Sequence, residues 1–221
     1  MDAEKVDREL VRAWVDGWIV SRQASPPVEE EWGFRFDVAL PKHVTRHVLP
    51  EADEALTVKL MAACPAPGTH LKVLLPPETV RPWLLPGWTL DDPGFLMTVP
   101  LTPVPAPVPD GFRLRTWARG GLVRALVVDG RGVFAARGQV AIPPGAETAV
   151  VDQVETAADQ RRKGLGGLVM RTLANAAAEA GASTAVLGAS TDGRALYTAL
   201  GWRTVSPLTG IIHRPDAAPV V

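Results

Sequence analysis

The 221-residue sequence is poor in several chemically distinctive features, and each shortage excludes a class of protein. Its single cysteine, Cys64, excludes an intrachain disulfide and a cluster of thiolate metal ligands. The formal net charge at pH 7 is only −1, so the chain lacks the broad positive surface that binds nucleic acid or an acidic membrane. No apolar run is long enough to span a membrane, and the acidic first residues lack the order of a signal peptide. We therefore expect a cytoplasmic protein without nucleic-acid or membrane partners.

Apolar residues, by contrast, are plentiful. They make up 47% of the chain, which supports a real core, and the length allows one large or two small domains. One short tract alternates proline with small or apolar residues, which is typical of an extended connector because proline fits neither a helix interior nor a central strand. We predict an N-terminal domain over residues 1–102, a linker over 103–110 and a C-terminal domain over 111–221.

The first half has the patterns of a small α/β domain. Apolar residues recur at helical spacing over residues 3–22, and residues 32–38 alternate between apolar and polar as in a half-buried strand. Residues 88–101 read as a hairpin or as paired strands. His43 and His47 are expected on one face of a strand, but no third ligand is near, so we interpret them as packing or surface residues and expect no metal site.

The second half begins with four strand patterns, followed by a helix, a strand, a helix and a last strand. In this order they cover residues 112–117, 122–128, 132–142, 146–156, 164–180, 184–188, 191–200 and 202–212. Turn signals between the early strands favour an antiparallel meander. The predicted fold class is therefore α/β, with a mixed, mainly antiparallel sheet flanked by helices.

The turn between the fourth strand and the long helix, Gln160 to Gly167, is both cationic and rich in glycine. Glycines let the backbone curl so that several N–H groups point to one side, and the positive end of the following helix lies at the same place. Such a turn suits a phosphate or pyrophosphate, with a solvated charged turn as the alternative. It lacks the third glycine of a dinucleotide-binding fingerprint and the Gly-Lys-Ser/Thr of a P-loop.

Two motifs resemble the GNAT superfamily of N-acetyltransferases. Arg161-x-x-Gly164-x-Gly166 is similar to that family's acyl-CoA pyrophosphate loop. Residues 196–202, Leu-Tyr-x-x-Leu-Gly followed by an aromatic residue, are similar to its second signature. The resemblance covers roughly residues 111–213 and implies a GNAT-type sheet with acetyl-CoA, or another acyl-CoA, as cosubstrate.

The resemblance also implies which residues form the site. Tyr197, the only tyrosine, matches the usual general acid, and a phenol with a pKa of about 10 is protonated at neutral pH. Glu155 is the candidate base; the alternatives are a water chain in its place and a packing role for Tyr197. Ser190 stands where the family often has asparagine. The residues implied to contact the acyl-CoA are Val154, Thr156, Arg161, Arg162, Lys163, Gly164, Leu165, Gly166, Gly167 and Ser190.

One departure from the family concerns the first half. The family usually has two helices between its first and second strands, whereas only residues 118–121 stand here. Those helices cover one sheet face and line the acceptor side of the cleft, so we expect residues 1–100 to complete both. Leu85-Pro-Gly-Trp88 is similar to Leu200-Gly-Trp202, which suggests a degenerate second copy of the fold that lacks the CoA loop.

The sequence thus predicts an acyl-CoA-dependent N-acyltransferase in which a primary amine attacks the thioester directly in a ternary complex. The alternative is a non-catalytic GNAT-like module that binds acyl-CoA as a sensor or scaffold. The acceptor stays open among a small metabolite, a drug-like amine, a peptide N-terminus and lysine, and the acyl length and the choice of monomer or homodimer stay open too.

Overall fold

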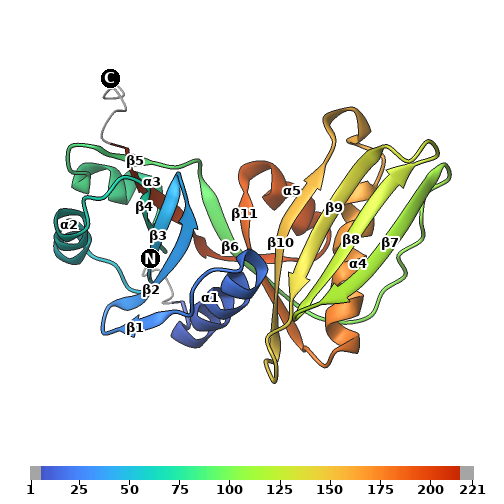
Figure 1. Ribbon diagram of the computed structural model, residues 1–221, viewed down its shortest axis with the longest axis horizontal. Coiled ribbons are helices and arrows are strands. Elements are labelled where there is room, and N and C mark those ends of the chain that lie inside the picture. Colours follow the sequence, from blue (N-terminus) through green and yellow to red (C-terminus); the bar gives the residue numbers. More distant parts are fainter. Residues whose placement is uncertain (1–5, 215–221) are drawn as a thin grey trace.

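The computed structural model describes residues 6–214 and contains two β-sheets flanked by helices (Figure 1). The strands are β1 (Val28–Glu30), β2 (Gly33–Leu40), β3 (His43–Leu49), β4 (Thr69–Val73), β5 (Trp88–Leu90), β6 (Gly94–Pro100), β7 (Phe112–Arg119), β8 (Leu122–Asp129), β9 (Phe134–Ala141), β10 (Thr148–Thr156), β11 (Thr184–Ser190), β12 (Arg203–Pro207) and β13 (Thr209–His213). The helices are α1 (Arg8–Arg22), α2 (Glu54–Ala63), α3 (Pro77–Val80), α4 (Leu165–Glu179) and α5 (Thr191–Ala199), with 3₁₀ turns η1 (Arg81–Trp83) and η2 (Ala158–Gln160).

The two sheets repeat one topology. Sheet A has the order β1-β2-β3-β4-β13-β5, and sheet B has the order β12-β6-β11-β10-β9-β8-β7. The meander β1-β2-β3 in sheet A corresponds to β8-β9-β10 in sheet B, and each meander leads through a helix, α2 or α4, into a parallel neighbour, β4 or β11. Sheet B carries β7 as an additional edge strand. This repeat supports the interpretation of the first half as a second copy of the same fold.

The two copies exchange their last strands. β6 comes from the first half but lies between β11 and β12 of sheet B, antiparallel to both. β13 comes from the end of the chain but lies between β4 and β5 of sheet A. The predicted pairing within residues 88–101 is therefore wrong, because the chain crosses from sheet A to sheet B between β5 and β6. Both sheets draw strands from both sides of the proline-rich residues 103–110.

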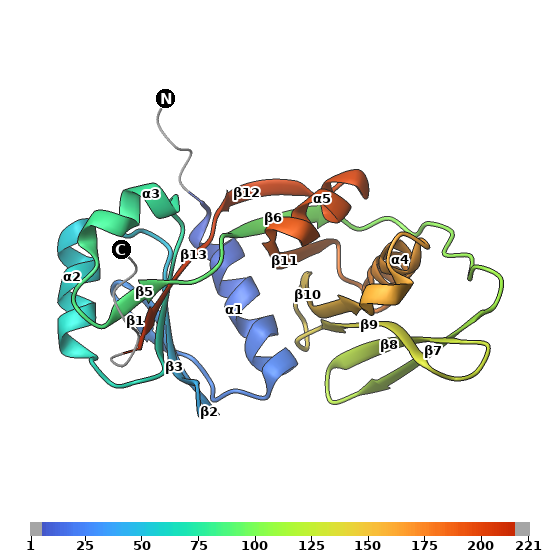
Figure 2. The same ribbon diagram turned by 90° about the horizontal axis from the view of Figure 1, so that it is seen from above.

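Helix α1 lies between the two sheets (Figure 2). Its buried side chains recur every three or four positions, as the helical period requires. The core that they share with both sheets includes Val11, Trp14, Val15, Trp18, Phe34, Phe36, Val150 and Val186. Gly17 lies so close to Val150 that a methyl group on it would overlap with the valine side chain. Helix α1 thus covers the face of sheet B that the short β7–β8 turn leaves without a helix of its own.

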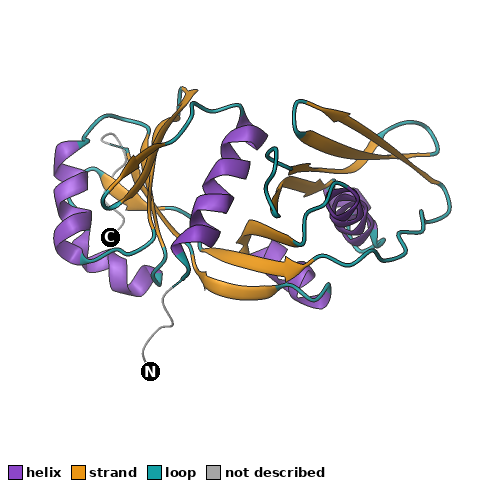
Figure 3. Ribbon diagram, turned by 90° about the horizontal axis from the view of Figure 1, so that it is seen from below, coloured by secondary structure: helices purple, strands orange, loops and turns teal. Residues whose placement is uncertain are grey.

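The remaining helices cover the outer faces. Helices α4 and α5 pack on the other face of sheet B, where Leu165, Val169 and Leu173 of α4 are buried. Helices α2 and α3 pack on the far face of sheet A, as Figure 3 shows with helices in purple. The layers therefore follow the order α2/α3, sheet A, α1, sheet B, α4/α5.

The proline-rich connector is attached to α4. The backbone N–H of Val104 donates to Oδ1 of Asn175 at 3.0 Å, and Nδ2 of Asn175 donates back to the carbonyl of Val104 at 2.8 Å. An extended segment without secondary structure gains a fixed position in this way, because one amide side chain satisfies both backbone groups.

His43 and His47 do not share a face, so that prediction was wrong. His43 stacks on His70 with ring centroids 3.9 Å apart, whereas Nε2 of His47 lies 3.7 Å from Sγ of Cys64 at the end of α2. The ring of His43 also lies 5.8 Å from that of Trp18 in α1 between centroids, so His43 is on the α1 side of sheet A and His47 is on the α2 side. Within residues 6–214, no group of three or more His, Cys, Asp or Glu side chains is arranged to hold a metal ion. Nor is any helix described there long and apolar enough to cross a membrane.

Candidate functional site

The central strands of sheet B separate partway along their length. β10 and β11 pair in parallel only over residues 148–150 and 184–186, after which β10 continues with β9 and β11 with β6. The corresponding strands of sheet A, β3 and β4, stay paired over residues 45–49 and 69–73. Beyond Val150, the edge of β10 that faces β11 has no strand partner within the described chain. An extended ligand can therefore pair with that edge.

A bulge interrupts β10 just after this separation. The register with β9 shifts between Asp152 and Glu155, and Gln153 has a φ of 54°. Val154 packs into the core beneath α4, so the next residue, Glu155, points to the opposite face, the one that α1 covers. There Nη2 of Arg137 lies 2.8 Å from Oε2 of Glu155. Because the bulge adds one residue to β10, Asp152 and Glu155 point to the same face of the sheet although they are three positions apart.

The predicted phosphate loop follows β10. Arg162 and Gly164 have φ values of 64° and 77°, so the backbone takes left-handed conformations at both positions. Helix α4 then begins at Leu165 without a side-chain cap, which leaves the N–H groups of its first turn available. The side chains of Arg161 and Arg162 are exposed and have no partner within residues 6–214. The loop therefore combines free backbone donors, the positive end of a helix and two free guanidinium groups.

Other residues of the loop have structural roles besides. Nζ of Lys163 donates to Oε1 of Gln160 at 2.8 Å. A Cβ atom at Gly166 would lie 2.9 Å from Cδ2 of Leu196, so this glycine lets α4 and α5 approach each other. At Gly167 the nearest atom would be 3.9 Å away, which leaves room for a methyl group. Substitution of Gly166 would therefore disturb helix packing as well as any bound phosphate.

Tyr197 lies in α5 and is 8% exposed. Burial raises its pKa to about 12, and the negative charge of Asp152 acts in the same direction. Its hydroxyl has no hydrogen-bond partner among the described residues, so no backbone carbonyl holds it. Ser190 caps the same helix, its hydroxyl accepting from the N–H of Gly193 at 3.2 Å. The phenol is therefore protonated at neutral pH and free to donate.

Comparison with known proteins identifies the family of this chain. A profile of the acetyltransferase (GNAT) family matches residues 89–202, from β5 to just beyond α5. The chain belongs to the GNAT acetyltransferase family. No curated protein sequence matches it.

Solved GNAT structures share the fold. The GCN5-related N-acetyltransferase from Kribbella flavida is 18% identical, with a TM-score of 0.68 over 97% of this chain and 98% of that one. An acetyltransferase of the GNAT family from Novosphingobium aromaticivorans is 18% identical, with a TM-score of 0.57 over 92% and 96%. A tandem GNAT protein from the clavulanic acid biosynthesis pathway is 15% identical, with a TM-score of 0.52 over 75% and 69%.

Sheet A and its helix α2 lack the features of the loop that precedes α4. At the corresponding helix, α2, the side chain of Asp53 accepts from the N–H of Leu56 at 2.8 Å, and Glu54 follows in the first turn. Carboxylates therefore occupy the place where a phosphate would have to lie, and their charge would repel one. Together with the continuous β3–β4 pairing, this makes sheet B the half of the GNAT protein that is suited to CoA.

Asp152 borders the candidate site, and the sequence did not single it out. Oγ of Ser21 donates to its Oδ2 at 2.6 Å and Nη2 of Arg22 donates to its Oδ1 at 2.9 Å, so it ties the end of α1 to β10. Burial by itself would raise the pKa of Asp152, but the hydrogen bonds and charge of Arg22 outweigh it and hold that pKa below its ordinary value. Arg22 and Ser21 lie 130 and 131 positions away from Asp152 in the sequence, so no local sequence pattern predicts these contacts.

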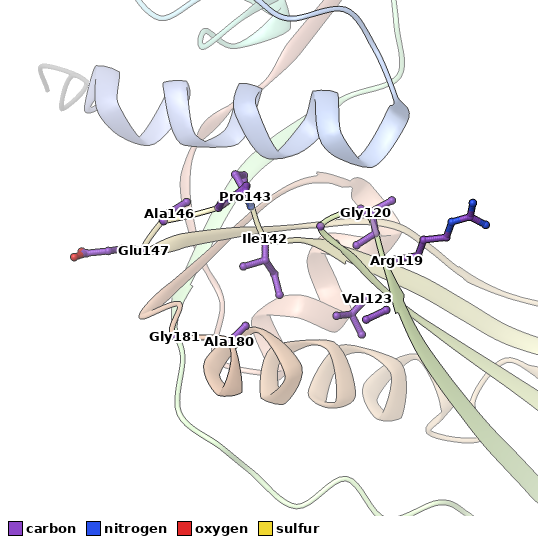
Figure 4. Close-up of a pocket in the computed structure, with 14 residues that line it drawn as sticks. Arg119, Gly120, Val123, Ile142, Pro143, Ala146, Glu147, Ala180 and Gly181 are labelled. Carbon is purple, nitrogen blue, oxygen red and sulfur yellow. The ribbon is translucent and has the colours of Figure 1, made fainter.

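Two cavities beside sheet B differ in their position relative to the loop and the bulge. One of about 630 Å³ lies at the C-terminal end of α4, away from the loop, and Arg119 and Glu147 at its rim point outward (Figure 4). Another of about 530 Å³ lies on the face that α1 covers and reaches Gln153 in the bulge. Only the second adjoins the features described above.

Proposed function

We propose that this protein is an acyl-CoA-dependent N-acyltransferase that transfers an acetyl group from acetyl-CoA to a primary amine. The observation that carries the proposal is the combination at one end of sheet B. There β10 parts from β11, the uncapped N-terminus of α4 follows a loop with two free arginines, and a protonated Tyr197 lies in the next helix. Membership of the GNAT family supports acyl transfer as the reaction class.

The residues present fit an acyl-CoA. Its pyrophosphate would lie against the N–H groups of residues 161–167, with Arg161, Arg162 and Lys163 supplying positive charge. Its pantetheine arm would run along the free edge of β10 at Val154 and Thr156, where backbone groups lack a strand partner. The start of α5 at Ser190 would border the same ligand. A carboxylate-capped helix such as α2 offers none of this.

When bound, acetyl-CoA supplies an acyl carbon held as a thioester; a C–N bond forms as the C–S bond breaks, the amine loses a proton and the sulfur gains one. We assign to Tyr197 the donation of a proton to the sulfur, because its hydroxyl is protonated and unengaged. We assign to Glu155 the removal of the amine's proton, directly or through water. Its side chain is 52% exposed, whereas Asp152 is enclosed by Ser21 and Arg22.

Calorimetric titration with acetyl-CoA tests the proposal. The double variant Arg161→Ala/Arg162→Ala removes two exposed side chains that have no partner within residues 6–214, so the fold should be unaffected. Charge-assisted hydrogen bonds are worth about 1.5–3 kcal/mol each, so the affinity should fall by about 10²-fold or more. Arg203→Ala, an exposed arginine on the edge strand β12, is the matched control and should bind as the unmodified protein does.

Two results would contradict the assignment. If the unmodified protein does not bind acetyl-CoA, then acetyl-CoA is not the acyl donor. If the double variant binds it with unchanged affinity, then the two arginines do not bind the pyrophosphate. Binding without release of free CoA thiol in the presence of any primary amine would favour a sensor or scaffold instead.

A further inference from the structure

The cavity next to the bulge has a distinctive charge. Its volume of about 530 Å³ is in the range of small-molecule sites. Arg22 from α1, Arg124 from β8 and Arg137 from β9 line it, and none of the described residues that line it is Asp or Glu. A cavity in which all the charged lining residues are cations favours a ligand that carries negative charge.

Only one of these arginines lacks a compensating carboxylate. Arg22 is paired with Asp152 and Arg137 with Glu155. Arg124 donates from Nε to Oε1 of Gln139 at 3.2 Å and makes no ion pair with any residue between 6 and 214. The site therefore has one uncompensated positive charge, and the terminal nitrogens of Arg124 are its free donors.

The position of Arg124 is fixed by a chain of hydrogen bonds. Nε2 of Gln139 donates to the carbonyl of Ser21 at 2.9 Å and to its Oγ at 2.7 Å, which leaves Oε1 as the acceptor for Arg124. Oγ of Ser21 donates in turn to Asp152. These groups hold the guanidinium in place before a ligand arrives, which lowers the entropic cost of binding.

The cavity also adjoins the reacting centre that we propose. Trp117, Arg124, Gln139 and Asp152 lie opposite one another across β7, β8, β9 and β10, so they share the face that α1 covers. The bulge residue Gln153 lines the cavity, and Glu155 holds Arg137 at its border. Trp117, 45% exposed, adds a flat apolar surface. A ligand here would contact one cation, an aromatic ring and the bulge at once.

We propose that this cavity receives the acceptor and that the acceptor is a small primary amine with an anionic group, a carboxylate or a phosphate, bound by Arg124. The proposal rests on the proposed function. The amine nitrogen forms the bond to the acyl carbon while the C–S bond breaks. Its proton goes to Glu155 or to water, and the sulfur takes a proton from Tyr197. The anionic group does not react and serves to hold the amine.

Matched amines test this directly. With acetyl-CoA saturating, release of free thiol is measured for two sets of amines whose members differ in the anionic group: 3-aminopropionate, 3-aminopropyl phosphate and propylamine, and phenylalanine beside phenethylamine. We expect kcat/KM to be at least about tenfold higher for an anionic member than for its uncharged congener. Arg124→Gln should lower that value by about 10–10²-fold for anionic amines and by less than about threefold for uncharged ones.

Two further variants exclude a general loss of structure. Arg124→Lys keeps the charge and should restore part of the preference. Arg115→Gln removes an exposed arginine from the neighbouring strand β7 that does not line the cavity, and it should leave the preference unchanged. Each variant should bind acetyl-CoA with the affinity of the unmodified protein.

The outcomes separate the two proposals. Acetyl-CoA binding with equal or faster transfer to uncharged amines overturns the anionic acceptor, as does an Arg124→Gln effect of the same size on both kinds of amine, or no transfer to any member of the sets. Absence of acetyl-CoA binding overturns the proposed function and this inference with it. A preference for carboxylate over phosphate, or the reverse, supports the inference and identifies the anion.

Discussion

Tyr197 and Glu155 lie on opposite faces of sheet B. Tyr197 belongs to the core beneath α4 and α5, whereas Glu155 points to the face that α1 covers. In the proposed reaction the amine attacks one face of the planar thioester and the sulfur lies in the thioester plane, so the two proton transfers take place at different positions around the acyl carbon. Placing the proton donor on one face and the proton acceptor on the other therefore suits the two transfers.

The role of Tyr197 as proton donor is tested by Tyr197→Phe. General acid catalysis is typically worth about 10²–10⁴ in rate, so turnover should fall by that factor while acetyl-CoA affinity changes little. Burial raises the pKa of Tyr197 to about 12, so the phenol remains protonated below that value. The loss should therefore be equally large at pH 7 and pH 9, measured by thiol release with an amine that the unmodified protein accepts.

The outcome that would contradict this role is specific. If turnover of Tyr197→Phe stays within about twofold, the ring is a packing residue beside Trp202, from which it is 6.0 Å away between centroids. A matched change in α5, Arg194→Ala, removes a side chain that contacts Thr204 and Phe95 but no proposed site residue, and it controls for loosening of the helix.

At the scale of elements, α1 covers the face of sheet B that, in the family, is usually covered by helices between the first two strands. Its contact with β10 depends on Gly17, which leaves the helix axis close to the sheet. The same helix ends at Arg22, which lines the proposed acceptor cavity and is fixed in position by its ion pair with Asp152. The depth at which α1 packs therefore affects both the core and the site.

Gly17→Ala should destabilise the protein. A helix interior normally gains about 1 kcal/mol from this change, but here the new methyl overlaps with both Cβ and a methyl of Val150, so no rotamer relieves it. Overpacking costs about 1–3 kcal/mol, and the net change in the free energy of unfolding should be negative. Urea denaturation measures it. Gly167→Ala, where the nearest atom is 3.9 Å away, should be neutral or stabilising, and equal effects of the two changes would refute the packing argument.

Local patterns in the sequence were sufficient for some elements and not for others. The helical period of residues 3–22 predicted α1, and the glycine-rich turn predicted the loop before α4, because both depend on neighbours in the chain. The strand periodicity near residues 88–101 was real, yet it carries no information about which sheet a strand joins. That choice depends on partners such as Leu187 for Met97, which lie far away in the sequence.

The candidate site divides in the same way. Its loop residues follow a contiguous motif and were predicted, whereas Asp152 and Arg124 act through Ser21 and Gln139, which come from other elements. An arginine or aspartate in a strand is an ordinary surface residue until its partners are known. Only the packing of α1 against β9 and β10 gives these two side chains their surroundings.

For the molecule as a whole, the placement of β6 in sheet B and of β13 in sheet A makes the two sheets interdependent. Without β6, β11 and β12 of sheet B would lose the strand between them, and without β13, β4 and β5 of sheet A would lose theirs. Unpaired strand edges are sites of aggregation, and removal of α1 would expose Val150 and Val186 as well. A polypeptide of residues 106–221 alone should therefore aggregate.

Cleavage of the connector should have the opposite result, because it removes no strand. A protease site inserted beside Val108, which is 41% exposed, lies beyond the attachment of Val104 to Asn175 and outside every sheet. After cleavage, β6 should stay in sheet B and β13 in sheet A, so the two polypeptides should elute together at the size of the intact protein and bind acetyl-CoA as before. Size-exclusion chromatography, with a denaturing gel to confirm cleavage, measures this. Separation into two folded species would show that each copy completes its own sheet, and a soluble, active fragment of residues 106–221 would lead to the same conclusion.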